Sequence, residues 1–171
     1  FDLMDNSVES IRGILSNLPS EGTTSVVLTT ITHKDDLLYE TLKNTSNYID
    51  NQDFGMSELL GIHLEGPFLS TSKKGAHKEE YIKDIELKKV KEIIETSNNK
   101  IKIVSLAIEK ASSEIIEYLL QNNIVVSIGH SNATFEEVES YVLKGVNNLT
   151  HFQNAMSGHH HRKPGVVTAG F

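Results

Sequence analysis

Short apolar runs alternate along the chain with segments whose apolar residues recur every three or four positions. That spacing places apolar residues on one face of a helix, whereas a short run rich in β-branched residues is typical of a buried strand. Strands are predicted at residues 23–30, 59–64, 101–107, 124–128 and 146–152, the last being the weakest. Helices are predicted around residues 8–18, 37–42, 87–94, 115–120 and 138–142.

Two of the predicted helices begin with the spacing of a capping box, in which an N-cap side chain and a Glu three residues later each bond the other's backbone N–H. Asn6 with Glu9 and Thr134 with Glu137 have this spacing. Gly145 is predicted to end the last helix. Residues 71–83 are polar and are predicted to form a long loop after the second strand.

Alternation of strands and helices predicts right-handed crossovers and a parallel sheet. Nearly continuous apolar strands agree with a sheet that is covered on both faces. Two architectures remain open, an open doubly wound sheet and part of a (β/α)8 barrel. We favour an α/β fold of the barrel type, a partial TIM-type barrel with about five of its eight strands. Residues 1–171 are predicted to form one segment of this barrel.

Composition narrows the range of functions. The net charge of −7 argues against a general nucleic-acid binder, which needs a basic surface, but it permits binding of a small phosphorylated molecule. The chain has no cysteine, so any metal must be bound by His, Asp or Glu. No apolar run approaches the ~20 residues of a membrane span. The first residues do not resemble a secretory signal, so we expect a cytoplasmic protein with no membrane partner.

Residues capable of catalysis stand where strands are predicted to end. His63 and Glu65 share one face of the second strand end, His130 follows the fourth strand, and His151 follows the fifth. Carboxyl ends of parallel strands form the active-site face of α/β folds. One carboxylate and two imidazoles could therefore bind one divalent ion with an open position for water.

Each of these residues also has an ordinary structural explanation. A single histidine at a strand end is more often structural than a metal ligand, and Glu65 before Gly-Pro could cap a turn. The metal hypothesis is stronger because the three groups stand at separate strand ends. We interpret His63 as structural, or as a neighbour of a ligand, because it has no clear metal partner.

Several longer motifs resemble the N-acetylglucosamine-6-phosphate deacetylases of the amidohydrolase superfamily. The most specific is Gly-Ile-His-Leu-Glu-Gly-Pro-Phe at 61–68, and the other blocks follow in family order. Those blocks are Lys-Lys-Gly-Ala-His at 73–77, Ser-Ile-Gly-His-Ser-Asn-Ala-Thr at 127–134, and the shorter matches at 150–151, 154–156 and 162–165. The resemblance extends through nearly the whole chain.

The resemblance implies hydrolysis of the acetamide of N-acetylglucosamine 6-phosphate to glucosamine 6-phosphate and acetate. Positions that match family metal ligands are Glu65, His130 and His151. Positions that match family substrate contacts are Ala76, His77, Asn154, Ala155 and, for the phosphate, Arg162. A guanidinium suits phosphate because it forms a planar pair of hydrogen bonds. The implied cofactor is a divalent metal, zinc first, with Fe2+, Mn2+ and Co2+ as alternatives, and the implied assembly is a homodimer.

Some family features are changed or absent. Gln153 stands where the family tends to carry an aromatic residue, and Lys163 stands where Glu is common. The family His-x-His motif does not precede Glu65, and the catalytic Asp expected after Gly165 is not present before Phe171. We therefore expect a barrel segment truncated at both ends, with no catalytic residue of its own and no activity alone. The alternatives are another metal-dependent amidohydrolase and a non-catalytic remnant that binds a sugar phosphate.

Overall fold

Five parallel strands form one sheet in the computed structural model. The structure describes residues 3–171, so the first two residues of the barrel segment predicted at 1–171 lie outside the described residues. The strands are β1 Ser25–Thr30, β2 Glu58–Glu65, β3 Ile101–Leu106, β4 Val125–Ile128 and β5 Asn148–Leu149. Each strand pairs with the one before it in the chain, giving the order β1-β2-β3-β4-β5. A doubly wound sheet reverses its order at a switch point, so this topology confirms the partial barrel.

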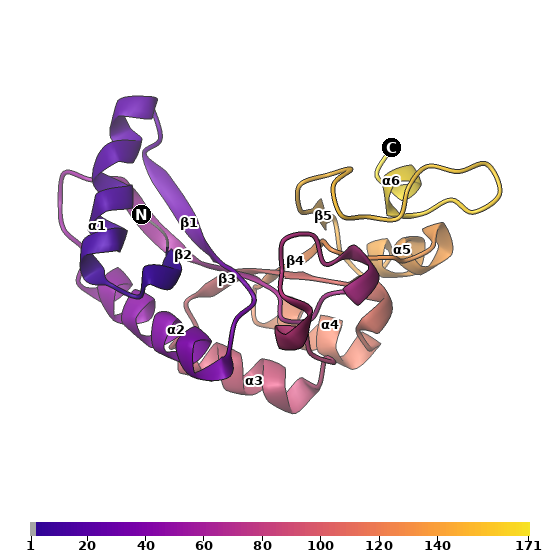
Figure 1. Ribbon diagram of the computed structural model, residues 1–171, viewed down its shortest axis with the longest axis horizontal. Helices are drawn as coiled ribbons and strands as arrows, with labels where there is room; N and C mark the ends of the chain where they lie inside the picture. The colour runs from indigo at the N-terminus through magenta and orange to yellow at the C-terminus, as the bar shows by residue number, and fades with distance from the viewer. Residues whose placement is uncertain (1–2) are drawn as a thin grey trace.

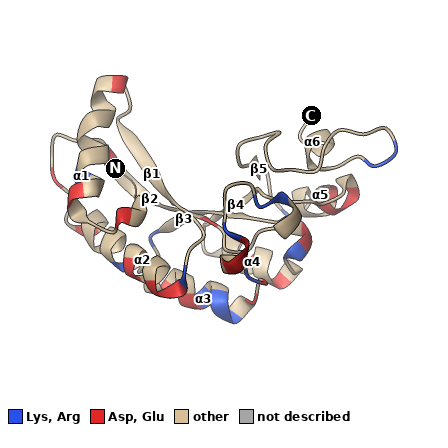
Figure 2. Cartoon of the chain, in the orientation of Figure 1, with Lys and Arg blue, Asp and Glu red and all other residues tan. Residues whose placement is uncertain are grey.

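Helices follow the strands along one side of the sheet in an arc (Figure 1). They are α1 Val8–Asn17, α2 Asp35–Asp50, α3 Leu87–Thr96, α4 Ser113–Gln121, α5 Phe135–Val142 and the short α6 Val166–Ala169. The sequence pattern did not predict α6. Charged residues gather on the helices and loops (Figure 2). Between residues 3 and 171, the chain forms no helix that combines the length and the apolar character needed to cross a membrane.

The core lies between the sheet and these helices. Leu64 of β2, Ile93 of α3 and Ile116 of α4 are among its fully buried members. Burying one such side chain stabilises the fold by about 1.5–3 kcal/mol. Because strand residues alternate between faces, burial of Leu64 against the helices turns its neighbours, His63 and Glu65, towards the inside of the barrel.

One predicted helix start is wrong and the other is confirmed. The N-cap of α1 is Ser7, whose hydroxyl accepts from Ser10 N at 3.1 Å. Asn6 adopts a left-handed φ of 55° and instead accepts from Asn44 Nδ2 through its side chain. Asn and Ser are similarly good caps, so the sequence alone does not choose between adjacent positions. At α5 the capping box of Thr134 and Glu137 is present.

The ends of some elements also differ from the prediction. The strand expected at 146–152 is only Asn148–Leu149, because the chain turns after it towards the inside of the barrel. The polar loop at 71–83 contains two 3-10 turns, Thr71–Lys73 and Glu79–Tyr81. Gly145, with φ of 104°, follows the end of α5 as predicted.

Asp35, in the first turn of α2, forms ion pairs with Lys83 and, at 3.2 Å, with Lys89 of α3. Burial alone would raise the pKa of Asp35, but the hydrogen bonds from the two lysines outweigh it and lower that pKa. Because a third of the side chain is exposed, we expect Asp35→Asn to lower the free energy of unfolding by only about 1 kcal/mol at neutral pH.

The pH dependence follows from the sign of this shift. A carboxyl whose pKa is lower in the folded state stabilises above its unfolded pKa of about 3.9 and loses that effect as the pH falls through the folded value. Urea unfolding at pH 7 and at pH 3 should therefore show the difference from wild type shrinking in acid. Asp36→Asn is the matched control, since Asp36 is exposed in the same helical turn. An equal loss in both variants would show that the helix terminus, not the ion pairs, is responsible.

Candidate metal centre

Three side chains from three strand ends meet inside the barrel. Glu65 is the last residue of β2, and His130 and His151 each stand two residues beyond the ends of β4 and β5. Glu65 Oε1 lies 2.9 Å from His130 Nε2 and 3.1 Å from His151 Nε2. The two Nε2 atoms are 3.0 Å apart. The structure thus brings together the three predicted metal ligands in a nearly equilateral triangle.

Backbone carbonyls fix the protonation of both imidazoles. His130 Nδ1 lies 2.8 Å from the carbonyl oxygen of Lys73, and His151 Nδ1 lies 3.1 Å from that of Asn154. Since a carbonyl oxygen can only accept, each Nδ1 must carry the proton. In a neutral imidazole this leaves a lone pair on Nε2, as in metal-ligating histidines whose other nitrogen bonds a carbonyl. Both Nε2 atoms face Glu65 Oε1, so each can donate to the carboxylate when it carries a proton and can bind a metal ion when it does not.

The negative charge of Glu65, close to two imidazole nitrogens, favours a bound cation at this site. Burial of Glu65 would by itself raise its pKa, but hydrogen bonds with His130, His77 and His151 outweigh it and hold the pKa far below its usual value. Burial likewise acts to lower the pKa of His130, yet the bonds to Glu65 and to the Lys73 carbonyl raise it. A carboxylate and two imidazole nitrogens within about 3 Å of one another repel unless a proton or a metal ion lies among them.

The donor set fits a divalent metal. Two imidazole nitrogens and one carboxylate oxygen, with a position left for water, are the ligands of catalytic zinc sites. Ligands bound at about 2.0–2.2 Å to a tetrahedral ion lie roughly 3.3–3.6 Å from one another, slightly more than the observed 2.9–3.1 Å. The same donors also suit iron, manganese and cobalt.

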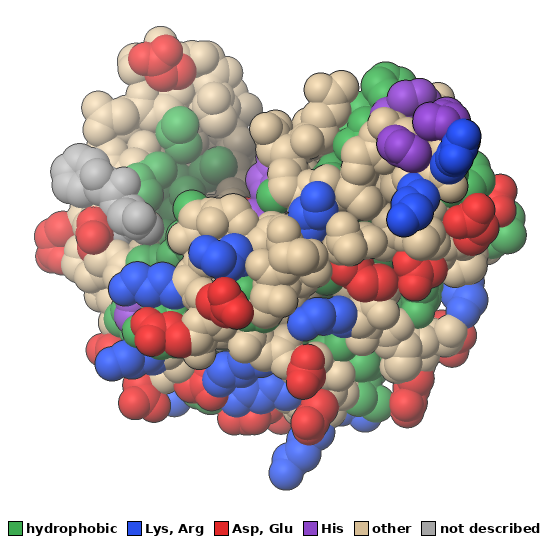
Figure 3. All heavy atoms as spheres, turned by 45° about the vertical axis from the view of Figure 1, so that its right-hand side comes forward, with side chains coloured by type: hydrophobic (Ala, Val, Ile, Leu, Met, Phe, Trp, Pro, Cys, Tyr) green, Lys and Arg blue, Asp and Glu red, His purple; other side chains and the backbone are tan. Residues whose placement is uncertain are grey.

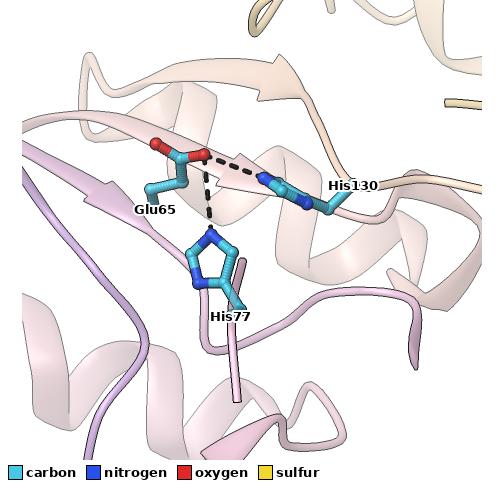
Figure 4. Close-up of side chains that lie close together, drawn as sticks. All are labelled: Glu65, His77 and His130. Carbon is cyan, nitrogen blue, oxygen red and sulfur yellow. Dashed lines mark hydrogen bonds and ion pairs between the residues drawn. The ribbon is translucent and has the colours of Figure 1, made fainter. Parts of the chain in front are cut away.

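His77 lies beside this triangle (Figure 4). The potential ligand atoms of Glu65, His77 and His130 all lie within 4.8 Å of one another. However, Thr32 N donates to His77 Nδ1 at 3.3 Å, with the Thr32 hydroxyl 2.8 Å from the same atom. Because a backbone N–H can only donate, Nδ1 is unprotonated and Nε2 carries the hydrogen. His77 therefore presents a donor, 3.7 Å from Glu65 Oε1, rather than a metal-binding lone pair.

An open cleft of about 360 Å³ at the strand ends contains this site. Figure 3 shows the molecular surface hollowed between two raised parts, with histidine visible at the hollow. Residues that line the cleft are Thr29, Thr30, Ile31, Glu65, Ala76, His77, His130 and His151. The predicted substrate contacts Ala76 and His77 are thus placed at the cluster.

The other predicted substrate contacts are placed less directly. Asn154 and Ala155 lie in the turn after His151, and the Asn154 carbonyl holds the His151 ring, but neither residue lines the cleft. Arg162 is exposed in the loop before α6 and lines a separate groove beside the start of α5. The structure does not bring Arg162 to the Glu65 cleft. Its exposed neighbours in the loop are the histidines 159–161 and Lys163.

Both candidate histidine ligands have strained backbones. The φ angles of His130 and His151 are 49° and 36°, in the left-handed region that residues with a side chain rarely adopt. Gln153 and Ala155, in the turn after His151, are also left-handed. Each such residue costs about 1–2 kcal/mol, and strain of this kind persists where surrounding contacts enforce it, often at functional sites.

His63 is part of a hydrogen-bonded row on the inner face. Its Nδ1 lies 3.0 Å from Thr29 Oγ1 and its Nε2 lies 2.6 Å from Ser105 Oγ. Ser105 bonds Thr150, which lies 2.7 Å from Ser127 Oγ. We call these five residues the polar row. Burial lowers the pKa of His63, which favours the neutral ring. A neutral ring bonded to hydroxyl groups agrees with the interpretation of His63 as a structural residue.

Comparison with known proteins gives a consistent result, although no family model matches the chain. The chain is 37% identical over 169 residues to N-acetylglucosamine-6-phosphate deacetylase of Bacillus subtilis (strain 168), covering 97% of the chain and 43% of the relative. It is 32% identical over 170 residues to N-acetylgalactosamine-6-phosphate deacetylase of Escherichia coli O157:H7, covering 99% and 45%.

A solved structure of N-acetylglucosamine-6-phosphate deacetylase from Thermotoga maritima superimposes with a TM-score of 0.83 at 34% identity. The match covers 98% of this chain and 44% of that one. The chain therefore spans less than half the length of these relatives.

Proposed function

We propose that the chain is part of an N-acetylglucosamine-6-phosphate deacetylase, and that the complete protein hydrolyses the acetamide of N-acetylglucosamine 6-phosphate to glucosamine 6-phosphate and acetate. The 37% identity to the relative from Bacillus subtilis supports this proposal. The observation that carries this proposal is the triangle of Glu65, His130 and His151, in which backbone carbonyls hold both imidazoles with Nε2 facing one carboxylate oxygen. We further propose that zinc is the metal, and that the protein is a cytoplasmic homodimer, as the family resemblance implies.

Glu65, His130 and His151 would hold the metal in this reaction. A divalent ion in such a site acidifies water and polarises a carbonyl, which are the two requirements of amide hydrolysis. His77, fixed by Thr32, directs its Nε2–H into the cleft and can donate to an oxygen atom of the substrate. Glu65 is the only carboxylate among the described residues that line the cleft, so we assign proton transfer to the leaving amine to none of them.

The relative from Escherichia coli supports a second substrate, N-acetylgalactosamine 6-phosphate. The two sugars differ only in the configuration at one carbon of the ring, away from the acetamide. The ligand triangle acts on the acetamide and does not distinguish them. Selectivity would depend on contacts to the ring and phosphate.

Release of acetate from both sugar phosphates by the complete gene product tests the proposal. With zinc bound, we expect turnover of N-acetylglucosamine 6-phosphate, and removal of the metal by a chelator should lower the rate by on the order of 100-fold or more. Zinc added back should restore it. Equal turnover of unphosphorylated N-acetylglucosamine would favour a different amidohydrolase. Binding of the sugar phosphate without turnover, with zinc bound, would favour the non-catalytic alternative.

A further inference from the structure

Glu109 lies outside the cleft but holds the segment that carries His130. It belongs to the 3-10 turn Ile108–Lys110, which directly follows β3. One carboxylate oxygen accepts from Ser131 Oγ at 2.6 Å and the other accepts from Asn132 N at 2.7 Å. These are the two residues that follow His130. Both bonds are short, as expected for hydrogen bonds to a charged acceptor, which are about twice as strong as neutral ones.

The conformation of His130 requires such a restraint. Its φ of 49° is unfavourable for a residue with a side chain, so nearby contacts must hold it. The backbone supplies two contacts to carbonyl groups, because Ser70 N donates to the His130 carbonyl at 2.9 Å and Ser157 N donates to the Ser131 carbonyl at 3.0 Å. Glu109 fixes the Ser131 hydroxyl and the Asn132 N–H, which neither backbone contact restrains.

The chemistry of Glu109 indicates a specific use. No Lys, Arg or His within residues 3–171 forms an ion pair with it, although its side chain is half-buried. Its two carboxylate oxygens instead accept hydrogen bonds from Ser131 and Asn132. Ser131 is fully buried and its Oγ accepts from Ala133 N, so loss of Glu109 would leave the hydroxyl hydrogen without an acceptor in a site without solvent. The segment would then relax towards ordinary backbone angles and turn His130 Nε2 away from Glu65.

We propose that Glu109 is a positioning residue for the metal centre: through Ser131 and Asn132 it keeps His130 directed at Glu65 and thereby sets metal affinity without touching the ion. This inference rests on the proposed metal site. It predicts that Glu109→Ala weakens zinc binding by about 10–100-fold, the usual effect of removing a partner that orients a ligand. Glu109→Gln, which keeps the shape and one acceptor oxygen, should lie between Ala and wild type.

The test is titration of the metal-free complete gene product with zinc against a competing chelator, together with the absorption spectrum of the cobalt-loaded protein. Thermal unfolding without metal measures the structural contribution separately. Glu117→Ala, which removes an exposed carboxylate from α4, is the matched control and should bind zinc like wild type. Ser131→Ala should weaken binding too, and the double variant Glu109→Ala with Ser131→Ala should lose less than the product of the single effects.

The outcomes separate this inference from the proposed function. If wild type binds zinc and the Glu109 variants fold and bind it equally well with an unchanged cobalt spectrum, Glu109 has no positioning role while the metal site stands. If Glu109→Ala does not fold, the folded Glu109→Gln and Ser131→Ala variants decide by the same criterion. If wild type binds no zinc or cobalt, both the metal site and the inference are wrong.

Discussion

Glu65→Gln will abolish tight binding of a divalent metal while leaving the metal-free fold intact. Glutamine has the size of glutamate, so the strand end and its neighbours need not move. It has no charge, however, and its amide group cannot balance an ion that two neutral imidazoles share. Since removing a residue that only orients a ligand weakens binding by about 10–100-fold, loss of the carboxylate itself should exceed on the order of 100-fold. The measurement is metal content and affinity by chelator competition.

Two further variants sharpen this result. Glu58→Gln changes an exposed carboxylate at the opposite end of the same strand and should bind metal normally. His77→Gln should also retain the metal but lose activity, because Nε2 of His77 carries a hydrogen rather than a lone pair. Retention of metal by Glu65→Gln, or its loss from His77→Gln, would contradict the assigned ligand set. The second result would favour the alternative group of Glu65, His77 and His130.

Gly66→Ala will destabilise the protein by about 3 kcal/mol and displace His77. Gly66 has φ of 78°, and a Cβ added there would lie 2.0 Å from the Thr32 hydroxyl, which bonds the His77 ring. Backbone strain contributes about 1 kcal/mol and forced overpacking a further 1–3 kcal/mol. Because Gly66 directly follows Glu65, the backbone shift that relieves the clash should also lower activity. Urea unfolding gives the stability difference, and acetate release gives the activity.

Gly22→Ala is the matched control for this variant. Its φ of 81° is nearly the same, but no atom lies within 4 Å of the added Cβ. It should therefore show the backbone strain alone, at about 1 kcal/mol. The difference between the two variants measures the contacts of the added Cβ, chiefly with Thr32 and to a lesser extent with Leu69. Equal destabilisation would mean that Thr32 moves aside at no cost in stability. The hydrogen bonds from Thr32 to His77 would then be weaker than their distances indicate.

The sequence was sufficient to predict the alternation of strands and helices along the chain and the meeting of Glu65, His130 and His151, whereas the pattern favoured the barrel without excluding a doubly wound sheet. Both follow from general rules, since apolar periodicity identifies the elements and carboxyl ends of parallel strands share one edge. The position of β5 was predicted, but not its early end. That depends on the turn that carries His151, which tertiary contacts decide.

Side-chain contacts away from the strand ends could not be predicted. The hydrogen bonds from Thr32 determine which nitrogen of His77 is protonated, and Thr32 stands in a segment with no recognisable motif. Glu109 is one of many charged residues and carries no spacing signal. The loop with Arg162 matched a family motif, but its path relative to the cleft depends on packing after β5, about which a local pattern says nothing.

The polar row also affects which alignments of the five strands are allowed. Backbone hydrogen bonds in a parallel sheet form equally well after a strand slides, so they do not select one alignment. A slide by one residue would turn His63 or Ser105 towards the helices and leave former partners without hydrogen bonds, at about 1–3 kcal/mol for each buried polar atom. Misaligned sheets are therefore less stable than the native one. The polar row, whose His63 lies two residues before Glu65 in β2, thus selects the alignment that the three ligands require.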